Sequence, residues 1–405
     1  MANAAEIPVA KQRNDFAEVL IACATGLMLT YTVLFLCVVP LSGKIASGRD
    51  YVIYWATGQQ LIHRANPYDA DTMYRIEHSA GLSSRFTVGF VRNPPWALWL
   101  TLPLGLVGMR LGALLWSLVL FACLAISVRM LWLMLPHCKI YLPWLGVIFT
   151  PAVLCVTMGQ TSLFALLGYV LFLRFHATRP FIAGASLWLC ALKPHLFLPF
   201  GLVFLAWVLV SRSYKILAGA AVALAASCVA TALIDPTAWG DYARMMRTCG
   251  IEEEFIPCLG IALRLWLSPG TMWLQYLPSL LGCAWALGYF WPRRHAWDWM
   301  KDGSLLMLVS IVTAPYCWLF DQALAIPALL YGAYVTRSRI LLVVFVFACV
   351  LIQIELARDI KVQSAFYLWT APAWLAWYLL AGAFPRKPQQ DEPARRHEEI
   401  SAAGI

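Results

Sequence analysis

Long apolar segments recur along almost the whole chain, and they constrain its fold more than any other feature. Each is close to the length that crosses the hydrocarbon core of a bilayer. Of the 405 residues, 61% are hydrophobic and only 13% are charged, whereas about a quarter are charged in a soluble domain. We predict an all-α polytopic membrane protein. Its expected spans, about twelve, lie near residues 17–41, 110–135, 141–158, 160–175, 180–193, 196–211, 216–235, 272–291, 303–317, 321–336, 339–356 and 364–384.

The connections between these segments indicate how the chain crosses the membrane. Lys and Arg gather in alternate connections, and such loops are normally cytoplasmic. This pattern places residues 1–16 and 385–405 in the cytoplasm and the long loop 42–109 outside. One exception is "RDIK" at 358–361, which the pattern places outside although it holds two basic residues beside one aspartate. We therefore expect a multi-pass protein of the inner (plasma) membrane, with an integral domain over 17–384 and a disordered polar tail.

Three further features fit a membrane protein. The first apolar run, "FAEVLIACATGLMLTYTVLFLCVVPL", is too long for a cleaved signal peptide and lacks a small-residue cleavage site. The net charge of +9 comes from basic residues in short loops, so we expect a lipid bilayer and no nucleic acid as partner. The 12 cysteines form no CxxC or Cys/His cluster, and most lie in apolar segments. Cys249 and Cys258 share one outer loop, and a disulfide between them is left open.

The connections predicted to lie outside differ in content from the basic cytoplasmic loops. Their polar residues are Asp50, Asn66, Asn93, Gln160, Lys193, His195, Glu252, Glu253, Glu254 and Asp321. Chemistry is therefore expected on the external (periplasmic) face. Within the long loop, "PPWALWLTLPLGLVG" at 94–108 is too short and too interrupted by proline to span, so we predict an interfacial or re-entrant segment.

Asp50 stands directly after the first apolar segment, in "SGRDYVIYWATGQQ". Ionisable groups at membrane depth are costly and tend to be functional, and the charges that stop a span are usually basic and cytoplasmic. The alternative is a boundary charge that pairs with Arg49. After Asp50, the residues Tyr54, Gly58 and Leu61 have helical spacing, which predicts a short amphipathic helix.

Four other outer residues are candidates, each with a structural alternative. Lys193 and His195, in "CALKPHLFL", suit a phosphate group, although Lys193 could reach the headgroups from an apolar stem and His195 could serve packing. Gln160 could bind a sugar hydroxyl or cap the next helix. Asp321 could orient an acceptor, or form an ion pair with Lys193 or Arg264.

An ordered set of motifs resembles glycosyltransferase family 87. These are "GRDYVIYWATGQQLIHRANPYD", "RNPPW", "MGQTSL", "ALKPHLFLPF" and "APYCWLFDQALAIPAL", over about residues 45 to 335. The resemblance implies a GT-C fold and a membrane glycosyltransferase of the cell envelope that uses polyprenyl-phosphate sugars such as polyprenyl-phosphomannose. It also implies that Asp50 is the general base and that the transfer is inverting. Glycosyl transfer does need a base for the acceptor proton and donors for the leaving phosphate.

The predicted roles follow from both arguments. Asp50 is assigned to catalysis, and Lys193 and His195 to the donor phosphate. The predicted substrate-binding residues are Arg49, Tyr54, Asn66, Tyr68, Gln160 and Asp321. No metal and no cofactor is expected, because three adjacent carboxylates at Glu252–Glu254 cannot all face one ion from a helix and have no nearby His or Asp partner.

This sequence departs from the family at two places. Relatives often carry an aromatic residue at the position of Asn93, so no role is carried over to it. Some carry histidines near the position of Asp321, and this chain has none there, which leaves an Asp–His pairing in doubt.

The predicted reaction moves a hexose, in the first instance mannose, from a polyprenyl-phosphate donor to a lipid or glycan acceptor on the external face. The main alternative is a transporter or flippase for a lipid-linked sugar. Transporters more often show paired halves with interrupted helices, and no such symmetry is found here. A structural component of an envelope assembly would leave the ordered polar motifs unexplained.

Overall fold

A computed structural model describes residues 9–39, 41–83, 89–136, 138–248, 254–358 and 360–384. Three parts of the sequence predictions lie outside these ranges. They are the tail 385–405, the residues Glu252 and Glu253, and Cys249, one of the two cysteines of the undecided disulfide. The elements within them are all helices. They are α1 Val9–Val38, α2 Gly43–Ser47, α3 Tyr51–Ile62, α4 Ala70–Ser79, η1 Pro95–Thr101, α5 Leu102–Gly105, α6 Met109–Met134, α7 Leu142–Ile148, α8 Thr150–Met158, α9 Ser162–Phe175, α10 Pro180–Cys190, η2 Pro194–Phe197, α11 Leu198–Ser211, α12 Tyr214–Ile234, α13 Ala238–Thr248, α14 Leu259–Leu267, α15 Trp273–Phe290, η4 Trp291–Arg293, α16 Asp302–Thr313, η5 Leu319–Ala325, α17 Ile326–Val335, α18 Arg339–Ala357, η6 Ala365–Trp369 and α19 Thr370–Ala383.

Within the described ranges, five helical segments are long and apolar enough to cross a membrane. These segments are Glu18–Val38, Met109–Met134, Pro194–Ser211, Tyr214–Ile234 and Arg339–Ala357. Four apolar helices are shorter, at Ser162–Phe175, Pro180–Cys190, Asp302–Thr313 and Leu319–Val335. The protein is therefore an integral membrane protein, and the prediction of about twelve spans stays a prediction.

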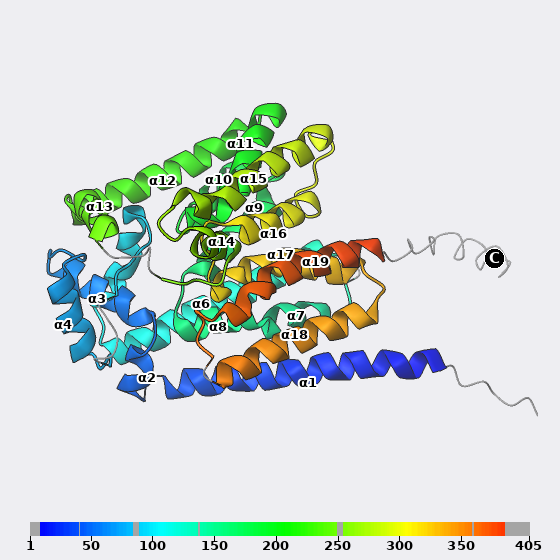
Figure 1. Cartoon of the computed structure of the whole chain (residues 1–405), viewed down its shortest axis with the longest axis horizontal. Helices are drawn as coiled ribbons and strands as arrows, with labels where there is room; N and C mark the ends of the chain where they lie inside the picture. The colour runs from blue at the N-terminus through cyan, green and yellow to red at the C-terminus, as the bar shows by residue number, and fades with distance from the viewer. Residues whose placement is uncertain are drawn as a thin grey trace, which may run out of the picture.

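The helices lie roughly along one direction, which separates the molecule into two ends (Figure 1). The start of α1 and the close of α19 lie at one end. The helices α2, α3, α4 and α13, which belong to the two long connections, lie at the other end (Figure 1). The start of α1 and the close of α19 thus lie opposite the helices of the loop 42–109, and the predicted orientation in the membrane stays a prediction.

Several predicted spans are interrupted where proline or a polar residue stands. The expected span 141–158 is two helices, α7 and α8, which break at Phe149 because the Pro151 ring disfavours continued helix. The expected span 321–336 begins with the 3₁₀ turns of η5 before α17. Breaks of this kind leave backbone and polar side chains available inside the protein, and membrane proteins tolerate them only where protein or water surrounds them.

The segment 94–108 folds as η1 and α5, two short helices that do not span. It packs against α3 at Gly58 and Gly105, where a Cβ on either glycine would overlap the opposite backbone. Gln59 Nε2 donates to Gly105 O at 2.7 Å and Trp55 Nε1 donates to Val107 O at 3.0 Å. These contacts fix α3, and with it the residue at its start, Asp50.

Candidate functional site

Asp50 lies at the beginning of α3, where its backbone carbonyl accepts from the Ile53 amide. Its side chain does not cap the helix. One carboxylate oxygen accepts a hydrogen bond from Gln160 Nε2 at 2.7 Å. Burial raises the pKa of this half-buried carboxyl, while the Gln160 hydrogen bond and the charges of Lys193, Arg49 and Arg92 act in the opposite direction. The arrangement leaves the second carboxylate oxygen available to accept a proton.

Arg49 does not pair with Asp50 and instead holds the end of α8. The buried guanidinium donates to Thr157 O, to Val156 O at 2.7 Å and to Ser117 Oγ at 3.0 Å. A cation at the last carbonyls of a helix is favourable, because it neutralises the negative end of the helix dipole. These bonds tie the backbone before α3 to α8, so the contact that Arg49 makes is with the protein itself.

A left-handed turn at Gly159 brings Gln160 to Asp50. Gly159 has φ +82°, and a Cβ there would lie 2.8 Å from the Tyr51 Cβ, so both conformation and space favour glycine. Trp116 Nε1 donates to the Gly159 carbonyl at 2.8 Å, which fixes the turn. The sequence left open whether Gln160 caps the next helix, and the Gln160 side chain is used for Asp50 and Lys193.

Lys193 lies between α10 and η2 and is buried. Its ammonium donates to Asp321 Oδ1 at 2.7 Å, to Ser162 Oγ at 3.0 Å and to Gln160 Oε1 at 3.1 Å. An ammonium has three hydrogens to donate, and all three have acceptors here. Lys193 can therefore contact a phosphate only by giving up one of these bonds.

Asp321, in η5, is fully buried. Besides Lys193 it accepts from Ser162 Oγ at 2.6 Å and from the Trp318 amide at 2.9 Å. Of the two cations that the sequence left open as partners, Lys193 forms the pair, and Arg264 donates instead to Pro269 O at 2.9 Å. The chain of contacts thus runs from Asp321 through Lys193 and Gln160 to Asp50.

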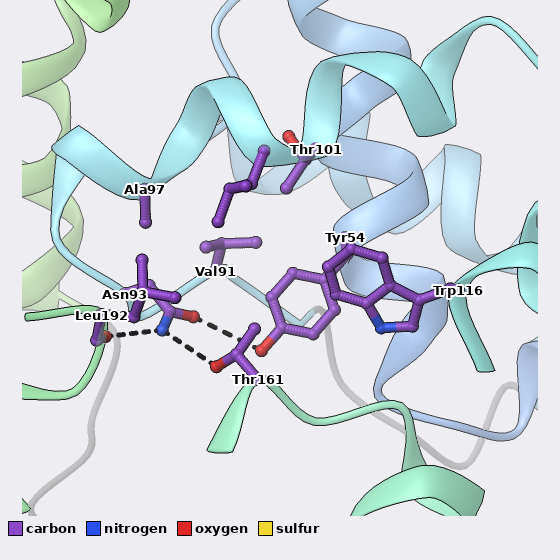
Figure 2. A pocket seen from close by; sticks show the side chains of 9 residues that line it. Tyr54, Val91, Asn93, Ala97, Thr101, Trp116, Thr161 and Leu192 are labelled. Carbon is purple, nitrogen blue, oxygen red and sulfur yellow. Dashed lines mark hydrogen bonds between the residues drawn. The ribbon is translucent and has the colours of Figure 1, made fainter. Parts of the chain in front are cut away.

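Tyr54 and Asn93 adjoin this network, and Figure 2 shows their side chains beside Thr161 and Leu192. Tyr54 Oη lies 3.4 Å from both Asn93 Oδ1 and Gln160 Oε1, and these two oxygens share its single hydrogen. Asn93 Nδ2 donates to Leu192 O at 2.8 Å and to Thr161 Oγ1 at 3.3 Å. A small pocket beside them, lined mainly by apolar side chains, has ≈ 10 Å³ of free space, about what one water needs. It is too small for a sugar.

The other predicted site residues lie apart from these contacts. His195 stacks on Tyr316, with ring centroids 3.7 Å apart. Asn66 Oδ1 accepts from the Tyr68 amide at 2.8 Å, a turn that connects α3 to α4. The Tyr68 ring is buried against Tyr242 at 5.8 Å. Within the described ranges, the network joins Asp50, Tyr54, Gln160, Lys193 and Asp321, while His195, Asn66 and Tyr68 form contacts of their own.

Sequence reasoning missed three participants. Asn93 and Ser162 are members of the network, and their signal was position: each stands next to a proline or glycine motif at an outer junction. Arg92 forms an ion pair with Glu254, one of the three adjacent carboxylates to which the sequence assigned no role. No periodicity connects these two residues, because 162 positions separate them along the chain.

The helices and the polar network at one end of them define an integral membrane protein with a buried polar site. Residues 90–315 match the model of glycosyltransferase family 87, which is more than half of the chain, and the chain belongs to this family. It is a membrane glycosyltransferase. No curated protein and no solved structure matches it. The matched range includes Gln160 and Lys193, whereas Asp50 and Asp321 join the site through their hydrogen bonds to these residues.

Proposed function

We propose that the protein transfers a hexose from a polyprenyl-phosphate donor to a hydroxyl of a lipid or glycan acceptor, and that this hexose is mannose. Asp50 is the general base and the anomeric configuration inverts. The reaction takes place on the external face of the inner membrane, and the fold is of the GT-C type. The resemblance of the ordered motifs to family 87 supports the donor class, and no metal ion or cofactor takes part.

One observation carries the catalytic assignment. Asp50 is a half-buried carboxylate on the residue directly before α3; its side chain does not cap that helix, and it forms no ion pair with the neighbouring Arg49. Its one hydrogen bond in the network comes from an amide whose other end is held by Lys193. A boundary charge needs no such support, whereas a base must be held in a fixed position.

The chemistry of the step follows from these groups. The acceptor oxygen forms a bond to the anomeric carbon as its proton moves to the Asp50 oxygen that does not accept from Gln160. The bond between the anomeric carbon and the phosphate oxygen breaks, and its electron pair leaves with the polyprenyl phosphate. A raised pKa makes Asp50 a stronger base than an exposed aspartate, which favours proton transfer from a hydroxyl.

The transporter alternative is less favoured by the position of the site. Transporter sites typically lie near the middle of the bilayer, between discontinuous helices of related halves. Here Tyr54 belongs to α3 and Asp50 directly precedes it, and α3 lies with α2, α4 and α13 at one end of the molecule (Figure 1). A site at this level suits a donor whose lipid tail stays in the membrane while its sugar leaves the hydrocarbon.

The test is transfer from a radiolabelled polyprenyl-phosphate sugar by purified protein carrying Asp50→Asn. We expect turnover to fall by about 10²–10⁴-fold, the usual contribution of a general base, while donor binding stays near that of the wild type. Asp50→Glu should restore only part of the rate, because a displacement of about 1 Å costs up to about 100-fold.

Asp71→Asn is the matched control, since Asp71 is an exposed carboxylate on α4 in the same connection. It should transfer at the wild-type rate. Full activity of Asp50→Asn would remove Asp50 from the reaction. Movement of the intact labelled donor across vesicles without transfer would favour the flippase.

A further inference from the structure

Arg92 and Glu254 form an ion pair with the geometry of a phosphate-binding contact. Arg92 Nη1 donates to Glu254 Oε2 and Nη2 donates to Oε1, each at 2.8 Å. The two side chains are 35% and 41% exposed. Two parallel bonds from one guanidinium to two oxygens are the arrangement in which arginine recognises carboxylate and phosphate alike.

The backbone of Arg92 is fixed next to the network around Asp50. Its neighbour Asn93 is buried and bonded to Tyr54 and Leu192, and Tyr242 Oη donates to the Arg92 carbonyl at 3.2 Å. The guanidinium is thus held at the edge of the site while its head remains half-exposed. Both Arg92 and Glu254 lie within the residues that match the family.

The positive charges that act on the Asp50 carboxyl belong to Lys193, Arg49 and Arg92. Lys193 and Arg49 are buried: the Lys193 ammonium has three protein acceptors, and Arg49 Nε and Nη2 donate to α8 and Ser117 while its Nη1 is buried without a hydrogen-bond partner. Arg92 pairs with the half-exposed carboxylate of Glu254, which lies in the other long connection. An ion pair at such a position contributes little to stability and is cheap to exchange. Among these three cations, Arg92 is the one that an incoming anion reaches at the lowest cost.

We propose that Arg92 binds the phosphate of the lipid donor, and that Glu254 occupies the same guanidinium until the donor arrives. The inference rests on the proposed function for the donor class. It also gives Arg92 a role in the step: negative charge grows on the phosphate as the glycosidic bond breaks, so the contact strengthens toward the transition state. Lys193 is then a positioning residue, which holds Gln160 against Asp50.

The test is equilibrium binding of a polyprenyl phosphate, the polyprenol of the same chain length and inorganic phosphate to the full-length protein in detergent. The wild type should bind the lipid phosphate more tightly than the alcohol, with inorganic phosphate a weak competitor. Arg92→Ala should weaken lipid phosphate binding by about 10- to 100-fold and remove the preference over the alcohol. Glu254→Gln should tighten it by up to about 5-fold, because the guanidinium no longer has to be vacated.

Arg244→Ala is the matched control. Arg244 forms a surface pair with Asp241 on the neighbouring α13, so its loss removes one positive charge from the same end of the molecule. Its binding should equal that of the wild type. The double variant Arg92→Ala/Glu254→Gln should bind as weakly as Arg92→Ala alone.

The outcomes separate this inference from the proposed function. A phosphate preference retained by Arg92→Ala, or equal losses in Arg92→Ala and Arg244→Ala, would overturn the assignment to Arg92 and leave Asp50 untouched. Equal affinity of the wild type for the lipid phosphate and the alcohol would overturn the donor class itself. Strong binding of inorganic phosphate, lost in Arg92→Ala and unaffected by a lipid chain, would assign Arg92 to a free phosphate and contradict the proposal.

Discussion

Two ion pairs join distant parts of this protein, and they differ in almost every physical respect. Lys193–Asp321 has side chains 9% and 0% exposed and a separation of 2.7 Å. Arg92–Glu254 is as short, at 2.8 Å, with side chains 35% and 41% exposed. The buried pair is surrounded by further hydrogen bonds, which offset the cost of removing two charges from water. Forming the half-exposed pair removes less charge from water, so breaking it costs less free energy.

This contrast in burial indicates that Lys193 is fixed in the protein and that the Arg92 contact is exchangeable. Lysine can only donate, so Gln160 has to present its oxygen to Lys193. Its amide nitrogen then faces Asp50, which as a carboxylate can only accept. The buried pair therefore sets the orientation of the group that holds the base. The half-exposed pair lies closer to solvent, so an incoming anion can compete with Glu254 for the Arg92 guanidinium.

The largest expected effect comes from breaking the buried pair on one side. Lys193→Met leaves Asp321 charged and without its counter-ion, and we expect the free energy of unfolding to fall by about 3–5 kcal/mol. The measurement is a denaturant titration of the purified protein in mixed micelles. A loss below about 1 kcal/mol would contradict the view that this pair is fully desolvated.

Removing both charges separates stability from catalysis. Lys193→Met/Asp321→Asn has no uncompensated charge, so most of the lost stability should return. Turnover should nevertheless remain about 10- to 100-fold low, because Gln160 has lost the donor that orients it and Asp50 is no longer held in place. Recovery of both stability and wild-type turnover would show that Lys193 has only a structural role.

The smallest effect is expected at the half-exposed pair. Arg92→Ala should change the free energy of unfolding by less than about 1 kcal/mol, as is usual for exposed ion pairs. The same titration in mixed micelles measures it. A loss of stability as large as that of Lys193→Met would show that the Arg92–Glu254 pair stabilises the fold and would contradict an exchangeable contact.

The sequence predicts the long helices well, because their apolar runs are continuous. The segments expected at 110–135, 216–235 and 339–356 are helices at Met109–Met134, Tyr214–Ile234 and Arg339–Ala357. It predicts broken segments less well, since a proline inside an apolar run, as at Pro151, permits either a kinked span or two short helices.

The candidate site was predictable in part, because the sequence indicates which connections share one side of the membrane. Alternation of basic loops assigned Asp50, Gln160, Lys193 and Asp321 to one side, and the structure joins them by hydrogen bonds. Which atoms meet depends on the left-handed turn at Gly159 and on helix packing, and neither is encoded in local periodicity.

The pH dependence of kcat/KM tests whether Asp50 is a titrating base that Gln160 holds in place. A base works when ionised, so activity should fall as the pH is lowered through the pKa of Asp50, which burial places above the ordinary value of about 3.9. The Gln160 hydrogen bond lowers that pKa. Gln160→Leu should therefore move the acid limb to higher pH, with circular dichroism confirming that both proteins stay folded. An acid limb at the same pH in both proteins, or an unchanged limb in Asp50→Asn, would contradict the account.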